Sequence, residues 1–260
     1  MLKDWRMVAV LVTVTTVFVI QHYMNFSWDF NSYLLNAQYW FSDGIYFEPY
    51  RPPLMPIALG MLSVLGWNAA SYMYVVLGSL LVGFASWQLA RSTGLDPFIF
   101  YVFLMSPYAL VYGMFNGTEL VSLAFLLLAV VRLLKRDPMA GLFLALAALL
   151  RYSYLPGLVL LIFLWDWKRI LKGVTWYAAA LFPWLLYNMI KYGNWFASIA
   201  DQYAMNMVYR HYINQPFRWQ HIDQVIGPLY PFLLLGVLSL IVYLAVWRQQ
   251  KTFPRARMGT

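Results

Sequence analysis

The chain has no cysteine and little charge of either sign. None of its 260 residues is a cysteine, which excludes disulfide bonds and thiolate catalysis. Charged residues make up 11% of the chain, whereas soluble globular proteins carry about a quarter. Hydrophobic residues make up 62%, more than a soluble fold of this length can bury. The composition therefore excludes a cytosolic enzyme, a disordered chain and a secreted disulfide scaffold, and it predicts an all-α integral membrane protein.

The motifs of several soluble enzyme classes are also absent. The chain has no P-loop, no dinucleotide-binding fingerprint and no G-x-S-x-G nucleophile. Its three histidines lack the spacing of metal ligands, so we expect no cofactor and no metal site, with a divalent metal left open. The net charge of +8 is explained first as a signal of membrane topology, so no nucleic-acid partner is expected.

What the chain does contain is a series of apolar runs, which predict about eight transmembrane segments in a single polytopic domain over residues 1–260. The runs are Trp5–His22, Ser71–Ala90, Pro97–Tyr112, Leu120–Leu134, Ala140–Leu150, Leu155–Trp165, Gly173–Ile190 and Ile226–Trp247. A spanning helix needs about 20 residues. Because Ala140–Leu150 and Leu155–Trp165 are shorter, we expect them to form a helical hairpin that is broken around Arg151 and Pro156. The short apolar stretch Leu54–Leu65 is predicted to be re-entrant or interfacial.

The basic residues predict the orientation of these segments. Most of the 18 Lys and Arg residues gather near the two termini and after the runs that end at Ala90, Leu134 and Trp165. The positive-inside rule then places both termini in the cytoplasm. The membrane that holds the protein would be either a prokaryotic plasma membrane or the endoplasmic reticulum. Two long connections, residues 22–53 and 191–224, are left on the extracytoplasmic side, where we expect them to form the active-site face.

Each outer connection contains an aromatic, amphipathic stretch. These stretches are Phe30–Phe41 in the first connection and Trp195–Tyr212 in the second. Trp and Tyr prefer the boundary between membrane and water. We therefore expect two interfacial segments that form a platform at the outer leaflet.

Two acidic residues near membrane depth, Asp29 and Glu119, are the catalytic candidates. Polar groups so close to hydrocarbon are expensive and often functional. Each acid has a structural alternative. Asp29 would otherwise be a solvated loop acid or a cap of the following helix, and Glu119 would be a first-turn acid behind an N-cap at Thr118.

Arg151 is the main candidate for binding a phosphate, because it lies at the break of the predicted hairpin. An arginine at membrane depth needs a partner, which is either a structural carboxylate such as Glu119 or a ligand phosphate. A third possibility is that its side chain reaches the membrane surface. Lys191 and Arg210 are the second choices for the phosphate. Further candidates for contacts with an acceptor or an anion are Glu48, Arg51, Tyr33 and His211.

Residues 28–56 resemble the first outer loop of the GT-C superfamily of integral-membrane glycosyltransferases. This superfamily includes protein O-mannosyltransferases, the aminoarabinose transferase of lipid A and the dolichyl-phosphate-mannose-dependent mannosyltransferases. The matching residues are Asp29, Tyr33, Ala37, Gly44, Pro52-Pro53-Leu54, Asn116-Gly117-Thr118-Glu119, the break at Arg151 and Pro156, Tyr187-Asn188 and Tyr192-Gly193-Asn194. Many relatives carry a paired Asp-Glu in this loop, whereas Phe30 follows Asp29 here. Either Asp29 acts alone, or Glu48 or Glu119 supplies the second acid.

The resemblance implies an inverting glycosyltransferase that moves a sugar, a hexose such as mannose, from a polyprenyl- or dolichyl-phosphate donor. The acceptor would be a hydroxyl of a lipid, glycan or protein on the extracytoplasmic side, with membrane lipids around the protein. Asp29 would act as the general base, Arg151 would bind the donor phosphate, and Glu119 would orient one of them or the acceptor. The alternatives are a transporter or flippase of a polyprenyl-linked substrate, or a non-catalytic subunit of a larger transferase.

Overall fold

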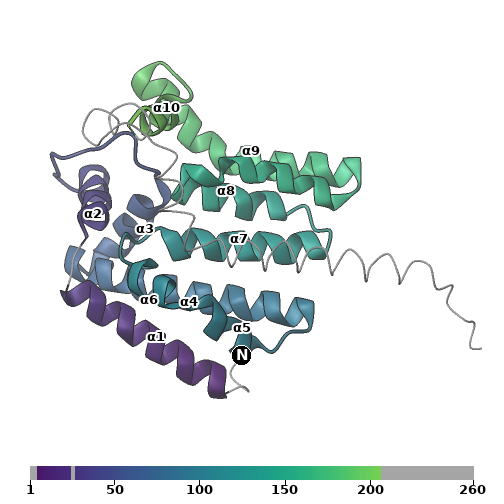
Figure 1. The fold of residues 1–260 in the computed structure, drawn as a ribbon. Helices are drawn as coiled ribbons and strands as arrows, with labels where there is room; N and C mark the ends of the chain where they lie inside the picture. Colours follow the sequence, from purple (N-terminus) through teal and green to yellow (C-terminus); the bar gives the residue numbers. More distant parts are fainter. Residues whose placement is uncertain (1–4, 25–26, 206–260) are drawn as a thin grey trace, which may run out of the picture. The chain divides into compact units, whose positions relative to one another are not determined.

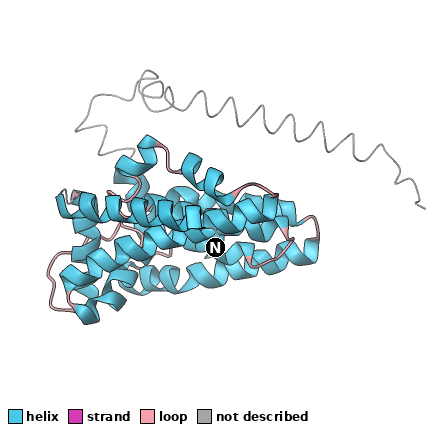
Figure 2. Cartoon of the chain, turned by 90° about the horizontal axis from the view of Figure 1, so that it is seen from below, coloured by secondary structure: helices cyan, strands magenta, loops and turns pink. Residues whose placement is uncertain are grey.

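The computed structural model describes residues 5–24 and 27–205. Helices and connecting loops make up all of this part, and no β-strand occurs in either described range (Figure 2). The prediction of an all-α chain is therefore confirmed. The predicted run Ile226–Trp247 and the candidates Arg210 and His211 lie outside the described residues.

The helices follow the apolar runs along the sequence. In chain order they are α1 (Trp5–Met24), α2 (Trp28–Phe41), α3 (Leu54–Leu62), the 3₁₀-helix η1 (Ser63–Leu65), α4 (Trp67–Thr93), α5 (Pro97–Leu104), α6 (Pro107–Tyr112), α7 (Glu119–Leu134), α8 (Ala140–Leu150), the 3₁₀-helix η2 (Tyr152–Leu164), α9 (Trp167–Tyr192) and α10 (Ala197–Ala204). In the described ranges two of them, α1 and α4, are long and apolar enough to cross a membrane, with mean hydropathies of 1.8 and 1.6. The prediction of about eight spans is thus not confirmed.

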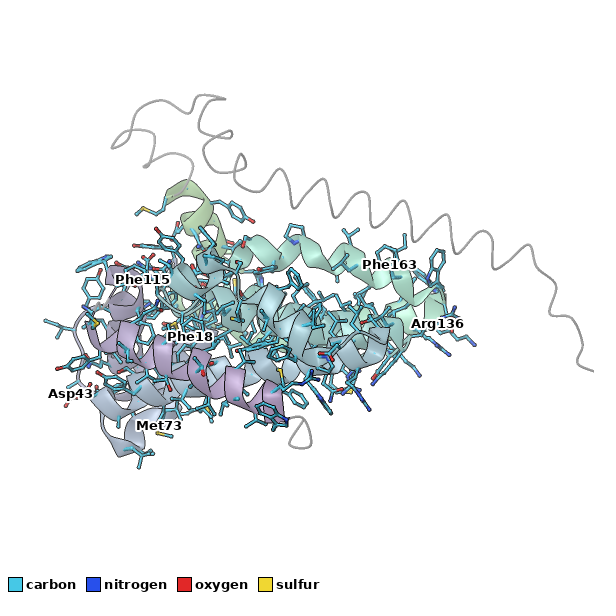
Figure 3. All side chains as sticks on the ribbon, turned by 60° about the horizontal axis from the view of Figure 1, so that its bottom comes forward. Phe18, Asp43, Met73, Phe115, Arg136 and Phe163 are labelled. Carbon is cyan, nitrogen blue, oxygen red and sulfur yellow. The ribbon has the colours of Figure 1, made fainter. Side chains whose placement is uncertain are left out.

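Helices α4, α7, α8 and α9 run side by side in that order (Figure 1). Helix α1 packs on α4, and η2 packs on both α8 and α9. Helices α1, α8 and α9 finish at one end of this bundle, and α7 begins there. We call this end the site end. The opposite end, at which α4 and α7 finish and α9 begins, is the basic end. Asp43 and Phe115 lie at the site end, and Arg136 and Phe163 lie at the basic end (Figure 3).

Small side chains allow α8 and α9 to approach closely. A Cβ atom added to Gly141 of α8 would collide with the backbone carbonyl oxygen of Gly173 in α9. The alanines of α8 at positions 140, 145, 147 and 148 are fully buried. Small residues are typical of helix contacts in membranes, where packing rather than the hydrophobic effect drives association.

One predicted span, Pro97–Tyr112, is wrong as a continuous helix. It forms the two short helices α5 and α6, capped by the side chains of Asp96 and Ser106. Pro107 is the first residue of α6, and its ring nitrogen has no N–H to continue the hydrogen-bond ladder of α5. The serine cap and the proline therefore end one helix and begin the next.

The broken hairpin has the predicted position but an unexpected second arm. Its first arm, α8, has the predicted bounds Ala140–Leu150, and Arg151 forms the break with an extended backbone. The second arm, η2, is a 3₁₀-helix of 13 residues. Since a 3₁₀-helix rises about 2.0 Å per residue and an α-helix about 1.5 Å, this arm extends over about 26 Å instead of about 20 Å. The arm is longer in space than its residue count suggests.

Each of the three segments predicted to be interfacial or re-entrant contains a helix in its described part. Phe30–Phe41 lies within α2, and Leu54–Leu65 forms α3 and η1. The described part of Trp195–Tyr212 contains α10.

Candidate functional site

The first candidate acid, Asp29, lies in the first turn of α2. The side chain of Ser27 caps this helix by accepting a hydrogen bond from the backbone N–H of Phe30 over 3.0 Å. Asp29 is therefore not the cap, and that alternative is wrong. Its Oδ1 lies 2.9 Å from Nη1 of Arg51, and 47% of its side chain is exposed. Asp29 is an ion-paired acid that solvent or a ligand can reach.

Arg51 is held by two carboxylates and two aromatic rings. Its Nη1 contacts Asp29, and its Nε donates a hydrogen bond to the carboxylate of Glu48. Its guanidinium lies 5.0 Å from the ring centroid of Tyr33 and 5.7 Å from that of Tyr50. Only 12% of the side chain is exposed, so these charge-assisted and cation–π contacts are largely shielded from water.

The loop that carries Glu48 and Arg51 is fastened to α2 by a buried amide. Asn36 Nδ2 donates a hydrogen bond to the backbone oxygen of Glu48 over 2.9 Å, and the backbone N–H of Glu48 donates to Asn36 Oδ1 over 2.8 Å. The hydroxyl of Tyr46 donates to the carboxylate of Glu48. The sequence prediction missed Asn36, which brings Arg51 to Asp29 across 22 residues of chain.

Burial and neighbouring charge act in opposite directions on this cluster. Burial by itself would raise the pKa of Glu48, but hydrogen bonds from Tyr46 and Arg51 outweigh it and hold that pKa below its usual value. Burial also disfavours the charged form of Arg51, yet the hydrogen bond to Glu48 and the nearby acidic groups raise its pKa. Both side chains therefore stay charged at neutral pH.

The second candidate acid, Glu119, is the first residue of α7 and forms an ion pair with Arg151. Asn116 Nδ2 donates to Glu119 Oε1 over 3.0 Å, and Thr118 Oγ1 donates to Oε2 over 3.4 Å. Thr118 occupies the predicted N-cap position and Glu119 the first turn, but the side chain of Thr118 makes no capping hydrogen bond. Of the partners left open for Arg151, the structure shows the structural carboxylate. The Arg151 side chain is 38% exposed and that of Glu119 is 29% exposed.

The turn before α7 packs directly against α2. Gly117 has a φ of 83°, and its carbonyl oxygen accepts a hydrogen bond of 2.8 Å from the hydroxyl of Tyr74. A Cβ atom at Gly117 would lie 2.8 Å from the ring of Phe30, which is closer than real contacts allow. Phe30 follows Asp29 and Gly117 precedes Glu119 by two residues, so this contact brings the two candidate acids to neighbouring surfaces.

Tyr33 lies one helical turn after Asp29, beneath the guanidinium of Arg51. Burial raises the pKa of Tyr33 to about 12, the positive charges of Arg51 and Arg151 oppose that rise, and the negative charge of Asp29 adds to it. The phenol is therefore within electrostatic range of both guanidinium groups. The hydroxyl therefore remains protonated at neutral pH.

An aromatic cluster, Trp40, Trp184 and Tyr187, joins the first outer connection to the end of α9. The ring of Trp40 lies 5.8 Å from that of Trp184 and 5.9 Å from that of Tyr187, and the last two stack 5.0 Å apart. Trp184 Nε1 also donates to the hydroxyl of Tyr152 over 2.6 Å. The spacing of Trp184 and Tyr187 on one helix face was a signal for this contact, which sequence reasoning did not use.

The remaining candidates are not brought into these clusters. Lys191 lies in the last turn of α9 with its side chain exposed, and it makes no ion pair with any residue in the described ranges. Within residues 5–24 and 27–205, no group of three His, Asp or Glu side chains is placed to hold a metal ion.

The family model of glycosyltransferase family 87 matches residues 49–259, which is most of the chain. The chain belongs to glycosyltransferase family 87. The prediction of a membrane glycosyltransferase is confirmed at this level, since family 87 enzymes are membrane proteins. No curated protein and no solved structure matches the chain. The matched range includes Arg51, Glu119 and Arg151. Asp29 and Tyr33 precede the matched range.

Proposed function

We propose that this family 87 chain is an inverting glycosyltransferase that moves a sugar from a polyprenyl phosphate to an acceptor hydroxyl on the extracytoplasmic side. Family membership supports glycosyl transfer over transport of a lipid-linked substrate. One observation carries the assignment of the site. Arg51, which pairs with Asp29, and Arg151, which pairs with Glu119, both lie within electrostatic range of Tyr33, at the site end.

In this proposal Asp29 is the general base. Its half-exposed carboxylate accepts the proton of the acceptor hydroxyl as the oxygen attacks the anomeric carbon. The bond between that carbon and the phosphate oxygen breaks, and the phosphate leaves with the electron pair. A single displacement inverts the configuration at the sugar carbon. The phosphate is already a good leaving group, so no general acid is required.

Arg151 binds the donor phosphate in the same proposal. It contacts one carboxylate and is partly exposed, so its planar guanidinium keeps N–H donors for two phosphate oxygens. Glu119 orients this guanidinium from the start of α7. Lys191 is a second cation at the end of α9, and Arg210 remains a candidate outside the described residues.

We also propose that the site end faces the extracytoplasmic side, with both termini in the cytoplasm. In this topology α1 and α4 cross the membrane, and α7, the α8–η2 hairpin and α9 complete the polytopic domain. The distribution of charge supports this orientation, because Lys135, Arg136, Lys168 and Lys172 all lie at the basic end. The donor's lipid chain would then lie among the apolar helices while its phosphate reaches Arg151.

The test of the proposed base is the variant Asp29→Asn. Membranes containing this variant are incubated with a panel of radiolabelled polyprenyl-phosphate sugars and a membrane extract as the source of acceptor. Loss of a general base should lower the transfer rate by about 10²–10⁴-fold. The matched control is Asp43→Asn, which changes an exposed acid in the same connection. Near wild-type transfer by Asp29→Asn would remove Asp29 from the mechanism, and thermal unfolding of both variants detects any loss of fold.

A further inference from the structure

The basic end carries positive charge that its own acids do not neutralise. Three carboxylates there each contact one arginine, in the pairs Asp96–Arg6, Asp137–Arg132 and Asp166–Arg169, at 3.4, 2.9 and 3.6 Å. In the turn before α8 and the first two turns of α9, four further cations have no carboxylate within ion-pair distance in the part of the chain that the structure describes. They are Lys135, Arg136, Lys168 and Lys172. Because the acids of this end are already occupied, the surplus charge is available to an external anion.

These four cations belong to two adjacent turns and the helix that follows. Lys135 and Arg136 lie in the turn between α7 and α8, and Lys168 and Lys172 lie at the start of α9, one helical turn apart. Nη1 of Arg169 donates a hydrogen bond of 3.3 Å to the backbone oxygen of Arg136, which links the two turns. The cations therefore form one surface rather than separate sites.

The backbone of the two turns is unusual. Arg136 has a φ of 53° and Trp165 a φ of 59°, and they are the only non-glycine residues with positive φ in the described ranges. Side chains with a Cβ atom seldom adopt this region, and such conformations persist where surroundings or function maintain them. Both exceptions occur at the basic end, one in each turn.

Exposed tryptophans lie beside the same cations. Trp165 is 74% exposed and Trp167 is 73% exposed, and they flank the turn that begins α9. Tryptophan is enriched at the headgroup level of membranes, where the indole ring contacts the lipid and the N–H stays hydrated. A soluble anion would use the cations but would gain nothing from these rings.

We propose that the two turns bind the phosphate headgroup of an anionic phospholipid, with Lys168 and Lys172 as the main contacts and Trp165 and Trp167 beside the upper acyl chain. Clustered basic residues next to membrane helices attract anionic lipids. This surface lies at the end opposite to the candidate active site, so it does not depend on the proposed catalytic roles.

The proposal is tested with the purified full chain in detergent, which separates lipid binding from the effect of the same charges on membrane topology. Phosphatidylglycerol is titrated and the lipid adducts are counted by native mass spectrometry. Each cation removed should lower the affinity by about fivefold, so the double change Lys168→Gln with Lys172→Gln should lower it by about 25-fold. The conservative pair Lys168→Arg with Lys172→Arg should retain binding.

Arg91→Gln is the matched control, because Arg91 is an exposed cation near the end of α4, outside the two turns. This variant should bind phosphatidylglycerol like the wild type. An equal loss per charge in Arg91→Gln and in the lysine variants would overturn the proposal in favour of diffuse attraction. Equal binding of phosphatidylcholine would overturn it as well, and so would displacement of the lipid by inorganic phosphate, which would identify a site for a free anion.

Discussion

Arg51 and Arg151 lie at the same end of the molecule in different surroundings. Arg51 is 12% exposed and contacts two carboxylates and two aromatic rings. Arg151 is 38% exposed and contacts one carboxylate, that of Glu119. Both guanidinium groups lie in the electrostatic range of Tyr33. The two arginines therefore face one region of the site, but their capacities for a further ligand differ.

The difference separates a positioning role from a binding role. A guanidinium has five N–H donors in a fixed plane, and a phosphate needs two of them on one edge. In Arg51 the donors are directed at Asp29 and Glu48, so this residue holds the candidate base in place. In Arg151 a single carboxylate leaves donors and surface for a ligand. The comparison therefore supports the proposal that Arg151 binds the donor phosphate and that Arg51 orients Asp29.

The largest expected effect that tests this comparison is the loss of stability in Arg51→Met. The change leaves the carboxylate of Glu48, with 11% of its side chain exposed, without its cation. We expect a cost of about 3 kcal/mol, because an uncompensated charge remains in a shielded site. The midpoint temperature of thermal unfolding should then fall by several degrees. Adding Glu48→Gln to the same chain should recover part of the loss in a double-mutant cycle, and strictly additive effects would contradict the coupling.

The companion variant, Arg151→Met, should show the opposite pattern. Its ion pair with Glu119 is partly exposed, so we expect a stability cost below about 1 kcal/mol. Loss of charge-assisted hydrogen bonds to the phosphate should cost about 1.5–3 kcal/mol in donor binding, which corresponds to an affinity about 10–150-fold lower. Equilibrium binding of a labelled polyprenyl-phosphate sugar measures this change. Unchanged donor affinity together with a large drop in thermal stability would reverse the roles of the two arginines.

A smaller effect is expected where the two clusters meet, at Gly117. Gly117→Ala adds a Cβ atom to a left-handed residue, at a backbone cost of about 1–2 kcal/mol, and pushes it against Met55 of α3 and Phe30 of α2. The matched control is Gly94→Ala, with a φ of 76° and no atom within 4 Å of the added Cβ. The difference in unfolding free energy between the two variants isolates the contacts of this turn with α2 and α3. If the two variants lose equal stability and both retain donor affinity, then the turn before α7 does not couple the clusters.

The sequence predicted those parts of the fold that depend on long apolar periodicity and on strong local signals. The bounds of α8 and the break at Arg151 are as predicted, and α1, α4 and α9 contain their predicted runs. The run of residues 152–164 was harder, because nearly every side chain is apolar. A run with almost no polar positions has no periodicity that distinguishes 3.0 from 3.6 residues per turn. The sequence therefore did not indicate the 3₁₀ geometry of this segment.

The site was predictable residue by residue but not as a set of contacts. Glu119 was among the partners considered for Arg151, since a cation at membrane depth requires one. The pairing of Asp29 with Arg51 was not predicted. It depends on two hydrogen bonds between the buried amide of Asn36 and the backbone of Glu48, one donated and one accepted by Asn36, and neither a pattern nor a spacing in the sequence specifies them.

The smallest expected effect concerns the pH dependence of the Glu48–Arg51 contact. The folded-state pKa of Glu48 is below its usual value, so its contribution to stability is present above the unfolded pKa of about 4.3 and is lost as pH falls through the lower folded value. The thermal stability of the wild type should therefore exceed that of Glu48→Gln by a constant amount at neutral pH, and the two should converge below about pH 4. A difference that persists unchanged into acid would mean that the charge of Glu48 does not hold Arg51, and the rings of Tyr33 and Tyr50 would then be sufficient to fix it.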